Sequence, residues 1–412
     1  MTFHKAASKS LNLVAIGMLT RHINYHVLVN LRMVKHCYKC KSSLIPPEAG
    51  KKANTSEEHI ILNALGGRLK SKDLLCKPCN DELGSRADAA LAKQLQSLSS
   101  LLQIKRQAGS TKDVTGTTDM GEKYILKEGY KPSIAFPVIE REPIAENAEK
   151  IRIVAGDKMQ MKKVLNNFKK KLPAFDVDDA MSKLKMKQEY LREPIMLSLQ
   201  VGGEPAFASI AKSAINFFIF NGGEEKYIEH LLPYIAGSVE STAVQHANQL
   251  GLVYELADTE VFHLLHLVGT NTMGLLYCYV EFYNVFSFIV VLSKEYRGKD
   301  MKHTYACDPV NGVNIVKNAS LELSPDDIVK IENEKIERQW PLIIPRFQRV
   351  MQIVDKKHTD IAISGLTKRV ADKVFSKYPE GTPVTQEMLW EYTTLLAQEF
   401  IKFQFRNHDP KS

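Results

Sequence analysis

A long uninterrupted apolar run is lacking in this chain of 412 residues. The longest apolar stretch, Leu275 to Leu292, is broken by Glu281, Asn284 and Ser287 and is rich in Tyr, Phe and Val. A membrane-spanning helix needs about 20 predominantly apolar residues, whereas aromatic and β-branched residues favour strands. The sequence therefore predicts two strands joined by a bend near Asn284, and no membrane span.

The chain also has little excess of charge of one sign. It contains 55 Lys and Arg against 47 Asp and Glu, which gives a net charge of +8 and a pI near 8.9. This mild basic bias is compatible with a polyanionic partner without demonstrating one. The hydrophobic fraction of 44% and the charged fraction of 25% are ordinary for a soluble globular protein. The length allows two or three domains, and no internal repeat is evident.

Cysteine is scarce, with six residues in the whole chain, and four of these form two C-x-x-C pairs. The pairs are Cys37 with Cys40 and Cys76 with Cys79, separated by residues 41–75. Clustered pairs in a long chain are better explained by a metal site in a reducing compartment than by a disulfide framework. Four thiolates can close a tetrahedral zinc shell with no open position, so the predicted zinc is structural. We accordingly expect a cytoplasmic protein.

The other candidate ligands are not close to this pattern. Cys278 and Cys307 lack the spacing of metal ligands, and we expect them to be buried thiols. His263 and His266 stand among apolar residues and are also expected to be buried. The sequence thus predicts a single thiolate cluster.

Residues 1–34 give no clear fold signal and are treated as an unassigned N-terminal extension. Lys5 and Lys9, followed by the apolar stretch Leu11 to Leu19, resemble a weak signal peptide. No small-residue cleavage site follows them. Translation beginning at Met33 is an alternative that the sequence leaves open.

A second motif lies between the two cysteine pairs. It reads EEHIILNALGG, and the second pair is followed at once by Asn80. The order C-x-x-C, E-H-I-I-x-N-A-L-G-G, L-L-C-x-x-C-N and G-x-x-x-D-x-x-L resembles the HNH endonuclease family, notably its zinc-containing branch. The resemblance covers residues 37–91, and the joint order is more specific than any single piece. It implies a small ββα-metal module that binds one divalent ion.

The resemblance implies a role for each matching residue. Glu58 stands at the position of an acidic metal ligand, His59 at that of the general base, and Asn80 at that of the last ligand. Asp73 occupies roughly the middle position, which usually holds an Asn that orients the histidine, and Asn63 competes for that role. A neutral imidazole can take a proton from water near neutral pH. Carboxylate and amide oxygens suit Mg²⁺ or Mn²⁺.

This sequence departs from the family pattern at two positions. The last ligand is Asn80 rather than a histidine, and the middle residue is Asp73 rather than an asparagine. Asp88 matches a further recurring acidic position, eight residues beyond Asn80, where it contacts metal or nucleic acid or serves packing alone. The implied reaction is one-ion hydrolysis of a phosphodiester, in which His59 activates water and the zinc takes no part.

Basic residues inside the module are candidates for contacts with a nucleic-acid backbone. We name Arg68, Lys70, Lys72 and Lys77 because they surround the proposed site in the sequence. The basic stretch from Lys158 to Lys171 is a further candidate. Its plainer interpretation is a solvated helix face.

The apolar periodicity predicts an α+β fold. The expected order is an HNH module with its zinc site (35–104), a linker or hairpin (105–122), an α+β domain (123–322) and a helical region (323–412). Homo-oligomerisation through residues 123–412 is possible. Expected strands are 57–62, 73–75, 124–126, 151–154, 195–201, one or more between 252 and 266, 274–283, 285–292 and 303–307. Expected helices are 83–102, 158–171, 206–220, 325–338, 343–355, 360–378 and 385–405.

Two functions from different classes fit these patterns. The first is a metal-dependent endonuclease acting on nucleic acid, with DNA preferred over RNA. The alternative is a non-catalytic zinc-finger protein that binds nucleic acid or regulates another protein. An enzymatic role for the middle region lacks support, since no phosphate loop, Ser-His-Asp order or second metal cluster is evident in the sequence.

Overall fold

The computed structural model describes residues 35–46, 53–109, 112–127, 131–145, 148–185, 193–197, 199 and 201–404. The N-terminal extension predicted for residues 1–34 lies outside them. None of the helices in these ranges has the length and apolar character needed to cross a membrane. The apolar stretch from Leu275 to Leu292 forms two strands, and the chain turns between them at Tyr283 and Asn284, which both have positive φ.

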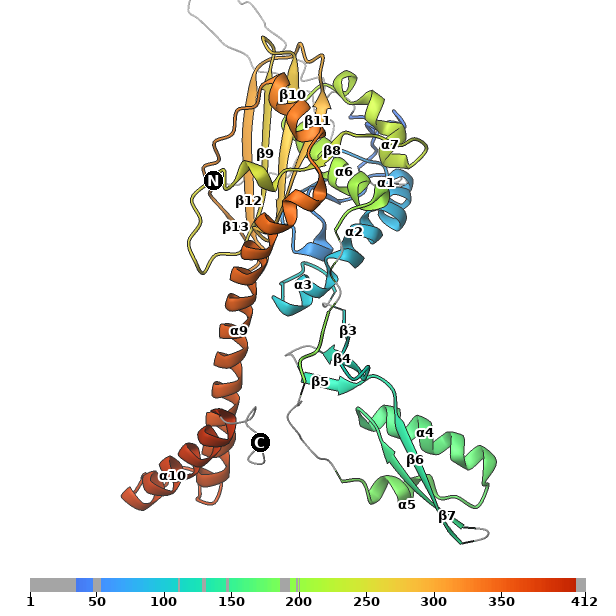
Figure 1. Ribbon diagram of the computed structural model, residues 1–412, viewed down its shortest axis with the longest axis vertical. Helices are drawn as coiled ribbons and strands as arrows, with labels where there is room; N and C mark the ends of the chain where they lie inside the picture. Colours follow the sequence, from blue (N-terminus) through green and yellow to red (C-terminus); the bar gives the residue numbers. More distant parts are fainter. Residues whose placement is uncertain are drawn as a thin grey trace, which may run out of the picture.

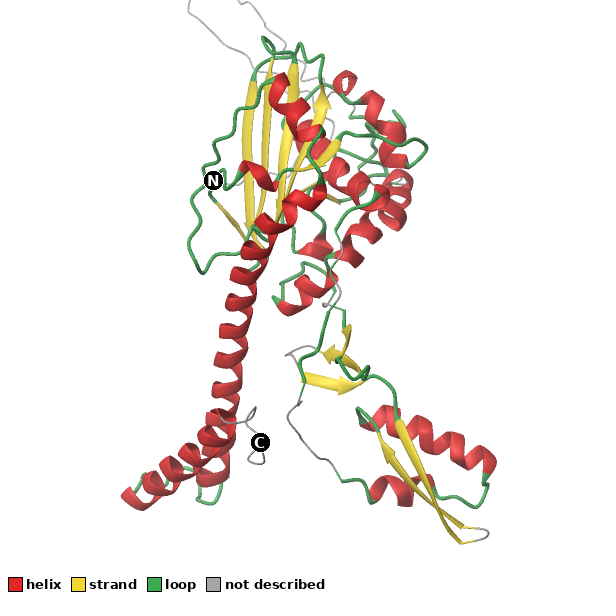
Figure 2. Cartoon of the chain, in the orientation of Figure 1, coloured by secondary structure: helices red, strands yellow, loops and turns green. Residues whose placement is uncertain are grey.

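Helices and antiparallel strands alternate along the chain, which confirms the predicted α+β class (Figures 1 and 2). The strands are β1 (Glu58–His59), β2 (Lys70–Ser71), β3 (Val114–Thr117), β4 (Lys123–Lys127), β5 (Lys131–Ile134), β6 (Val138–Ala145), β7 (Ala148–Val154), β8 (Val244–His246), β9 (His263–Thr270), β10 (Leu275–Phe282), β11 (Phe286–Ser293), β12 (Met301–Asp308) and β13 (Val313–Ile315). The α-helices are α1 (Lys77–Leu83), α2 (Ala89–Gln94), α3 (Gln96–Leu101), α4 (Lys158–Lys171), α5 (Val177–Ser182), α6 (Glu204–Phe220), α7 (Leu232–Ala236), α8 (Pro325–Glu332), α9 (Ile336–Phe375) and α10 (Gln386–Gln404). Short 3₁₀ turns are η1 (Asn63–Leu65), η3 (Glu225–Tyr227), η4 (Glu229–Leu231) and η5 (Asn248–Leu250), and η2 (Gly84–Asp88) is a π-helical segment.

The largest sheet has six antiparallel strands in the order β13-β12-β9-β10-β11-β8. Side chains of a strand alternate between its two faces, and β10 uses both faces for burial. Cys278 and Val280 join the core on the side of α6, whereas Tyr277 and Tyr279 join a second core with residues of α8. Because both faces are covered, β10 and its neighbours β9 and β11 are buried along nearly their whole length.

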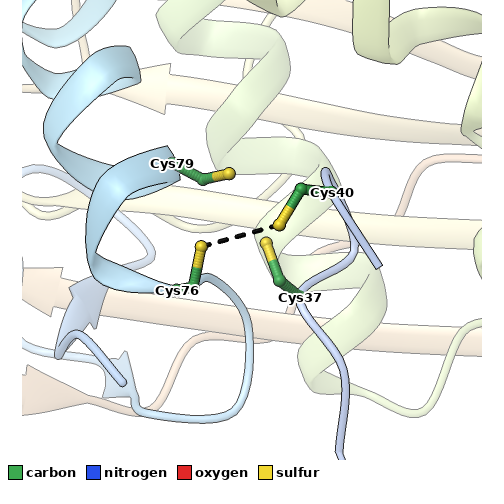
Figure 3. A group of neighbouring side chains, drawn as sticks. All are labelled: Cys37, Cys40, Cys76 and Cys79. Atoms are coloured by element: carbon green, nitrogen blue, oxygen red, sulfur yellow. Dashed lines mark hydrogen bonds between the residues drawn. The ribbon is translucent and has the colours of Figure 1, made fainter. Parts of the chain in front are cut away.

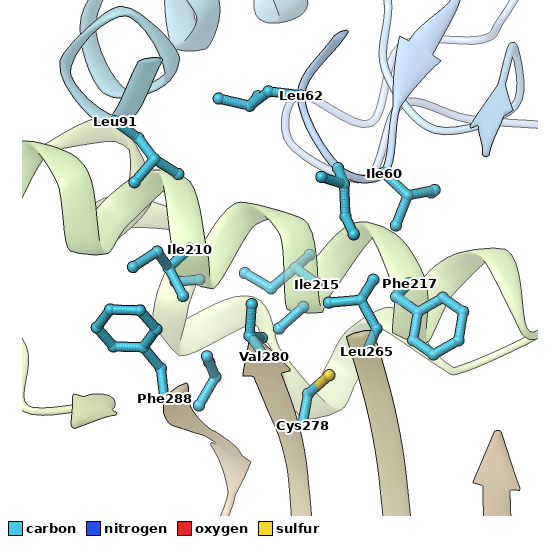
Figure 4. Packing of buried hydrophobic residues seen from close by; sticks show 14 of the residues in the cluster. Ile60, Leu62, Leu91, Ile210, Ile215, Phe217, Leu265, Cys278, Val280 and Phe288 are labelled. Atoms are coloured by element: carbon cyan, nitrogen blue, oxygen red, sulfur yellow. The ribbon is translucent and has the colours of Figure 1, made fainter. Parts of the chain in front are cut away.

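Helix α6 lies between the sheet and the N-terminal module (Figure 4). It follows Gly203, has Pro205 in its first turn and ends before Gly222, whose φ of +83° favours glycine. Most of its residues are buried, as expected for a helix that is apolar nearly all round. The helix therefore connects two layers rather than facing solvent.

The N-terminal module has the predicted ββα order. Strands β1 and β2 pair antiparallel, with Glu58 opposite Ser71 and His59 opposite Lys70, and α1 follows. The Gly66-Gly67 turn joins the strands. Gly66 has a φ of +91°, and a Cβ on Gly67 would lie 1.8 Å from the carbonyl oxygen of Ile61. Only glycine fits such a close backbone approach.

One hydrophobic core joins the module to the sheet. It contains Ile60 and Leu91 of the module, Ile210 of α6 and Val280 of β10 (Figure 4). This core crosses the boundaries predicted between the HNH module and the later α+β region. The module, α6 and the sheet therefore pack together in a single hydrophobic core.

Two parts of the chain extend away from this core (Figure 1). Strands β3 to β7 with α4 and α5 form one, and Met161, Leu165 and Val177 make a small core of its own. The segment 105–122, predicted as a linker or hairpin, contains β3. Helix α9, 40 residues long, forms the other and packs against α10 near its end.

Two predicted strands are wrong. Residues 73–75 form no strand. The partner of β1 is β2, a few residues earlier, and Leu74 and Leu75 turn into the core instead. Of the described residues within 195–201, Met196 alone pairs, in an isolated bridge to Thr117. Both segments are too short for their apolar residues to distinguish a strand from a buried loop.

Three predicted helical boundaries also differ. The helix expected over 325–338 is divided between α8, which ends at Glu332, and α9, which begins at Ile336. The segments expected at 343–355 and 360–378 are one continuous helix, α9, because no proline or glycine separates them. The helix expected over 83–102 begins earlier, with α1, and is interrupted by η2 before α2 and α3. A π-helical segment shifts the helical phase, and the apolar spacing alone does not reveal it.

Candidate active site

The four module cysteines meet at the start of α1 (Figure 3). Their sulfur atoms all lie within 4.8 Å of one another, and Cys40 Sγ is 3.6 Å from Cys76 Sγ. Zinc bound by four thiolates at about 2.3 Å places the sulfurs about 3.8 Å apart. The cluster can therefore bind a structural zinc ion with a closed shell.

Backbone hydrogen bonds bring the two cysteine pairs together. The Cys37 N–H donates to Ser42 O at 2.8 Å, which closes the first turn, and the Tyr38 N–H donates to Leu74 O at 3.1 Å. The second pair follows directly, with Cys76 as the residue before α1. A metal ion at this point would tie the loop that carries Cys37 and Cys40 to helix α1.

A pocket of about 320 Å³ opens beside this cluster. Side chains of three elements of the module line it: Glu58 and His59 of β1, Asn63 of η1 and Asn80 of α1. The complete lining is Glu57, Glu58, His59, Leu62, Asn63, Ala64, Asn80, Gly84, Asp88, Ala89 and Ala92. The structure thus brings together four of the residues singled out from the sequence as candidate site residues.

His59 is half-buried, and its orientation is set by Gln107. Nε2 of His59 lies 2.9 Å from Gln107 Oε1. The Gln107 amide is itself oriented, because Nε2 donates to Arg68 O at 3.5 Å and its backbone N–H donates to Asn63 Oδ1 at 2.8 Å. Because the Gln107 Oε1 atom can only accept, Nε2 is the donor in this hydrogen bond.

Glu58 is only 4% exposed, and its carboxylate turns toward α6. Oε1 accepts from Lys212 Nζ at 2.6 Å and from Asn216 Nδ2 at 2.9 Å. Burial raises the pKa of Glu58, and the nearby Lys212 ammonium opposes that rise. Neighbouring residues of a strand point to opposite faces, which separates Glu58 from His59 while both border the same pocket.

Asn80 and Asn63 line the pocket, whereas Asp73 does not. Asn80 Nδ2 donates to Ser56 Oγ at 2.8 Å, which leaves its Oδ1 outside that bond. Asp73 is exposed, pairs with Lys35 and is not part of the pocket lining. Asn63, the alternative for the middle position, is therefore the residue that the geometry places with His59.

Asp88 also borders the pocket, from the π-helical segment η2. Its Oδ1 accepts from Ser209 Oγ at 2.7 Å, and its Oδ2 accepts from Lys212 Nζ at 2.6 Å. Both carboxylate oxygens are thus engaged by α6. The sequence leaves several roles open for Asp88. These distances show packing against the protein interior, through contacts with α6.

The sequence pattern missed the contribution of α6. Ser209, Lys212 and Asn216 lie at positions i, i+3 and i+7, so they share one helix face. The signal was present, because a lysine and an asparagine interrupt an otherwise apolar helix. Gln107 gave no comparable signal, since it stands in an ordinary polar segment.

The basic residues predicted to contact nucleic acid mostly have partners within the chain. Lys70 pairs with Glu57 at 2.7 Å, Lys77 pairs with Asp81 at 2.8 Å, and Arg68 donates to Lys105 O. Lys72 is exposed. Glu57, the partner of Lys70, is a lining residue of the pocket.

The expected burial of the remaining candidate ligands is confirmed. Cys278 and Cys307 are fully buried, at 0% exposure. His263 and His266 are likewise buried in β9, and His263 Nε2 lies 2.8 Å from Leu65 O of the module. Within the described ranges, the cysteines of the module are the one group of three or more His, Cys, Asp or Glu side chains whose ligand atoms lie close enough to share an ion.

Residues 37–96 match the sequence model of the HNH endonuclease family. This match confirms the resemblance and extends it through α2, so the part of the chain that carries the cysteine cluster and the pocket is an HNH module. No curated protein matches the chain, and no solved structure matches it.

Proposed function

We propose that this protein is a metal-dependent endonuclease that hydrolyses phosphodiester bonds of nucleic acid, with DNA as the preferred substrate. The observation that carries the proposal is the convergence of His59, Asn63, Asn80 and Glu58 on one open pocket next to a closed four-cysteine cluster. The match of this segment to the HNH endonuclease family supports the same reaction class.

The pocket and the cysteine cluster suit different metals. Oxygen donors border the pocket, and Mg²⁺ and Mn²⁺ prefer such donors and keep several of their waters. Glu58 and Asn80 would hold the ion, and among the described residues no hydrogen bond engages Glu58 Oε2. When bound, such an ion neutralises the charge that develops on the phosphate.

His59 would act as the general base. Since Gln107 accepts from Nε2, the Nδ1 atom is the basic nitrogen that would take a proton from the attacking water. Asn63 and Gln107 act as positioning residues, because they fix the imidazole and its tautomer through hydrogen bonds of 2.8 and 2.9 Å. The zinc site would hold the fold and leave the reaction to the pocket.

The test is cleavage of supercoiled plasmid and of a single-stranded RNA in the presence of Mg²⁺ or Mn²⁺. We expect the wild type to cleave one of them, and His59→Ala to lose activity by about 100-fold or more, because it lacks the base. The variant should keep one zinc per chain. His303→Ala, in β12 outside the pocket, is the matched control and should cleave like the wild type.

A wild type that leaves both substrates intact with either ion would favour the second candidate, a zinc-binding module that contacts nucleic acid without cutting it. The closed cysteine cluster alone fits that candidate equally well. Cleavage by His59→Ala at the wild-type rate would remove His59 from the reaction.

A further inference from the structure

Helix α6 presents a polar face to the HNH module, from outside the segment that matches the HNH family. Ser209, Lys212 and Asn216 occupy this face, while the rest of the helix is largely apolar and buried. Buried polar groups need hydrogen-bond partners, and each of these three finds one on the HNH module.

Lys212 makes the central contacts of this face. Its Nζ lies 2.6 Å from Glu58 Oε1 and 2.6 Å from Asp88 Oδ2. Its side chain is 1% exposed, so the ammonium is desolvated and depends on these two carboxylates. Their charges raise the pKa of Lys212, against the effect of burial, so the lysine stays protonated.

Lys212 contacts the carboxylates of Glu58 and Asp88 on the side away from the pocket. Glu58 and Asp88 belong to the pocket lining, whereas Lys212 does not. The ammonium therefore holds the carboxylates from the interior rather than occupying the space into which a cation would enter.

Asn216 and Tyr38 extend the same contact. Asn216 donates to Glu58 Oε1 at 2.9 Å and accepts from the Tyr38 hydroxyl at 2.9 Å. Tyr38 stands beside Cys37, so this chain of hydrogen bonds runs from the cysteine cluster through α6 to Glu58. One oxygen of Glu58 is thus fixed by two donors of α6.

We infer that Lys212 is a positioning residue of the metal pocket, which fixes Glu58 Oε1 from the interior so that Oε2 can bind the divalent ion. The inference rests on the proposed function for the identity of the pocket. It assigns Asp88 as the second anchor of Lys212 rather than as a metal ligand. The pocket is then complete only when α6 is packed against the module.

Charge and position can be separated with two variants of the full-length, zinc-loaded protein. Glu58, Asp88 and Lys212 together carry a net charge of −1. The double variant Lys212→Met with Asp88→Asn keeps that net charge but removes the anchor. It also avoids leaving two buried carboxylates without a counter-ion, which would endanger folding. Asp88→Asn alone makes the net charge zero but keeps the bond between Lys212 and Glu58.

The measurement is Mn²⁺ binding without nucleic acid, followed through the electron paramagnetic resonance signal of free Mn²⁺. If Lys212 positions Glu58, the Mn²⁺ concentration for half-saturation should be about tenfold higher in the double variant than in Asp88→Asn, a typical effect of losing an outer-shell partner. If charge alone mattered, the double variant would bind Mn²⁺ better than Asp88→Asn. That reversed order overturns the inference.

Equal loss in both variants would make Asp88 a ligand and would also overturn it. Lys357→Met is the matched control, because Lys357 is half-buried and donates to Leu102 O of the module far from the pocket lining. It should bind Mn²⁺ like the wild type. Thermal unfolding of each variant verifies that the fold is retained.

Cleavage assays on the same proteins keep the two proposals apart. A wild type that binds Mn²⁺ in the predicted order yet cuts no nucleic acid contradicts the endonuclease and leaves the role of Lys212 standing. A wild type that cuts, with no difference between the two variants in Mn²⁺ binding, contradicts the role of Lys212 alone. A wild type that binds no Mn²⁺ overturns the role of Lys212.

Discussion

At the residue scale, the contact between the HNH module and the sheet depends on buried ionisable side chains. His263 of β9 is fully buried, with Nε2 2.8 Å from Leu65 O and with Nδ1 facing the Tyr283 N–H at 3.2 Å. The carbonyl can only accept and the N–H can only donate, so both bonds require the neutral ring with its proton on Nε2. The module is therefore held to the sheet by a histidine that cannot take up a proton without losing a bond.

This arrangement predicts a loss of stability in mild acid. Burial lowers the pKa of His263 to about 4, from 6.5 in an exposed chain. Between pH 6.5 and pH 4 the unfolded chain binds a proton that the folded chain does not, so the free energy of unfolding falls as the pH falls through this window. The contribution of one such histidine is on the order of 3 kcal/mol.

Urea unfolding of the wild type and of His263→Gln across this pH range measures the effect. We expect a shallower loss of stability in the variant, because glutamine does not titrate. Some slope should remain, since burial also lowers the pKa of His246 and of His266 to about 4. A slope identical to that of the wild type would mean that His263 does not contribute.

The cysteine cluster of the module could be predicted from the sequence, because its four ligands follow a local spacing pattern. Cys37, Cys40, Cys76 and Cys79 follow a spacing that four-thiolate metal sites require, and the structure brings their sulfurs together. The partners of Glu58 could not be predicted in this way. Lys212 and Asn216 lie more than 150 residues away, and a lysine on an apolar helix names no partner until the fold is known.

At the scale of elements, α1 and α6 connect the cysteine cluster to the main core. Cys76 and Cys79 begin α1, and Tyr38, next to Cys37, bonds to Asn216 of α6. Removal of the zinc should therefore loosen α6 as well as the two cysteine turns.

Hydrogen exchange of Cys79→Ser tests this coupling. We expect loss of zinc and faster exchange both in residues 76–83 and in peptides of α6, because the two share one hydrophobic core. Helix α4 has a separate core and should exchange as in the wild type. Cys278→Ala, a buried cysteine of β10, is the control and should keep its zinc. Faster exchange confined to the cysteine turns would contradict the coupling.

For some helices and strands, sequence periodicity is sufficient to predict where the element begins and ends. Helix α4 occupies the same residues that the sequence predicts for it, and in the structure Asp157 caps its first turn. Strands β10 and β11 were predicted within one or two residues for a similar reason, since a turn at Asn284 separates them. Strand β2 was misplaced because two residues are too few to form a pattern.

At the scale of the whole molecule, the protein contains an HNH module that is part of the main fold. Among the described residues, Ile60, α6 and the sheet share one core, so the module packs directly against residues 204–354. The sequence predicts the module and the α+β class, but packing between distant segments has no local sequence signature. The domain boundaries predicted at residues 104 and 123 therefore stay a prediction, and the main hydrophobic core contains residues from both sides of them.

The central claim is that two separate metal chemistries adjoin in one module, a closed cysteine cluster that holds the fold and an open pocket that cuts. The most direct test is extensive dialysis of the purified protein into metal-free buffer, followed by zinc analysis and a plasmid cleavage assay. Thiolate-bound zinc is retained because its binding contributes about 10–16 kcal/mol, whereas an ion held by a few oxygens leaves. We predict one zinc per chain, no cleavage after dialysis, and recovery of cleavage when Mn²⁺ is added. Undiminished cleavage by the dialysed protein, or loss of cleavage that follows the loss of zinc, would contradict the claim.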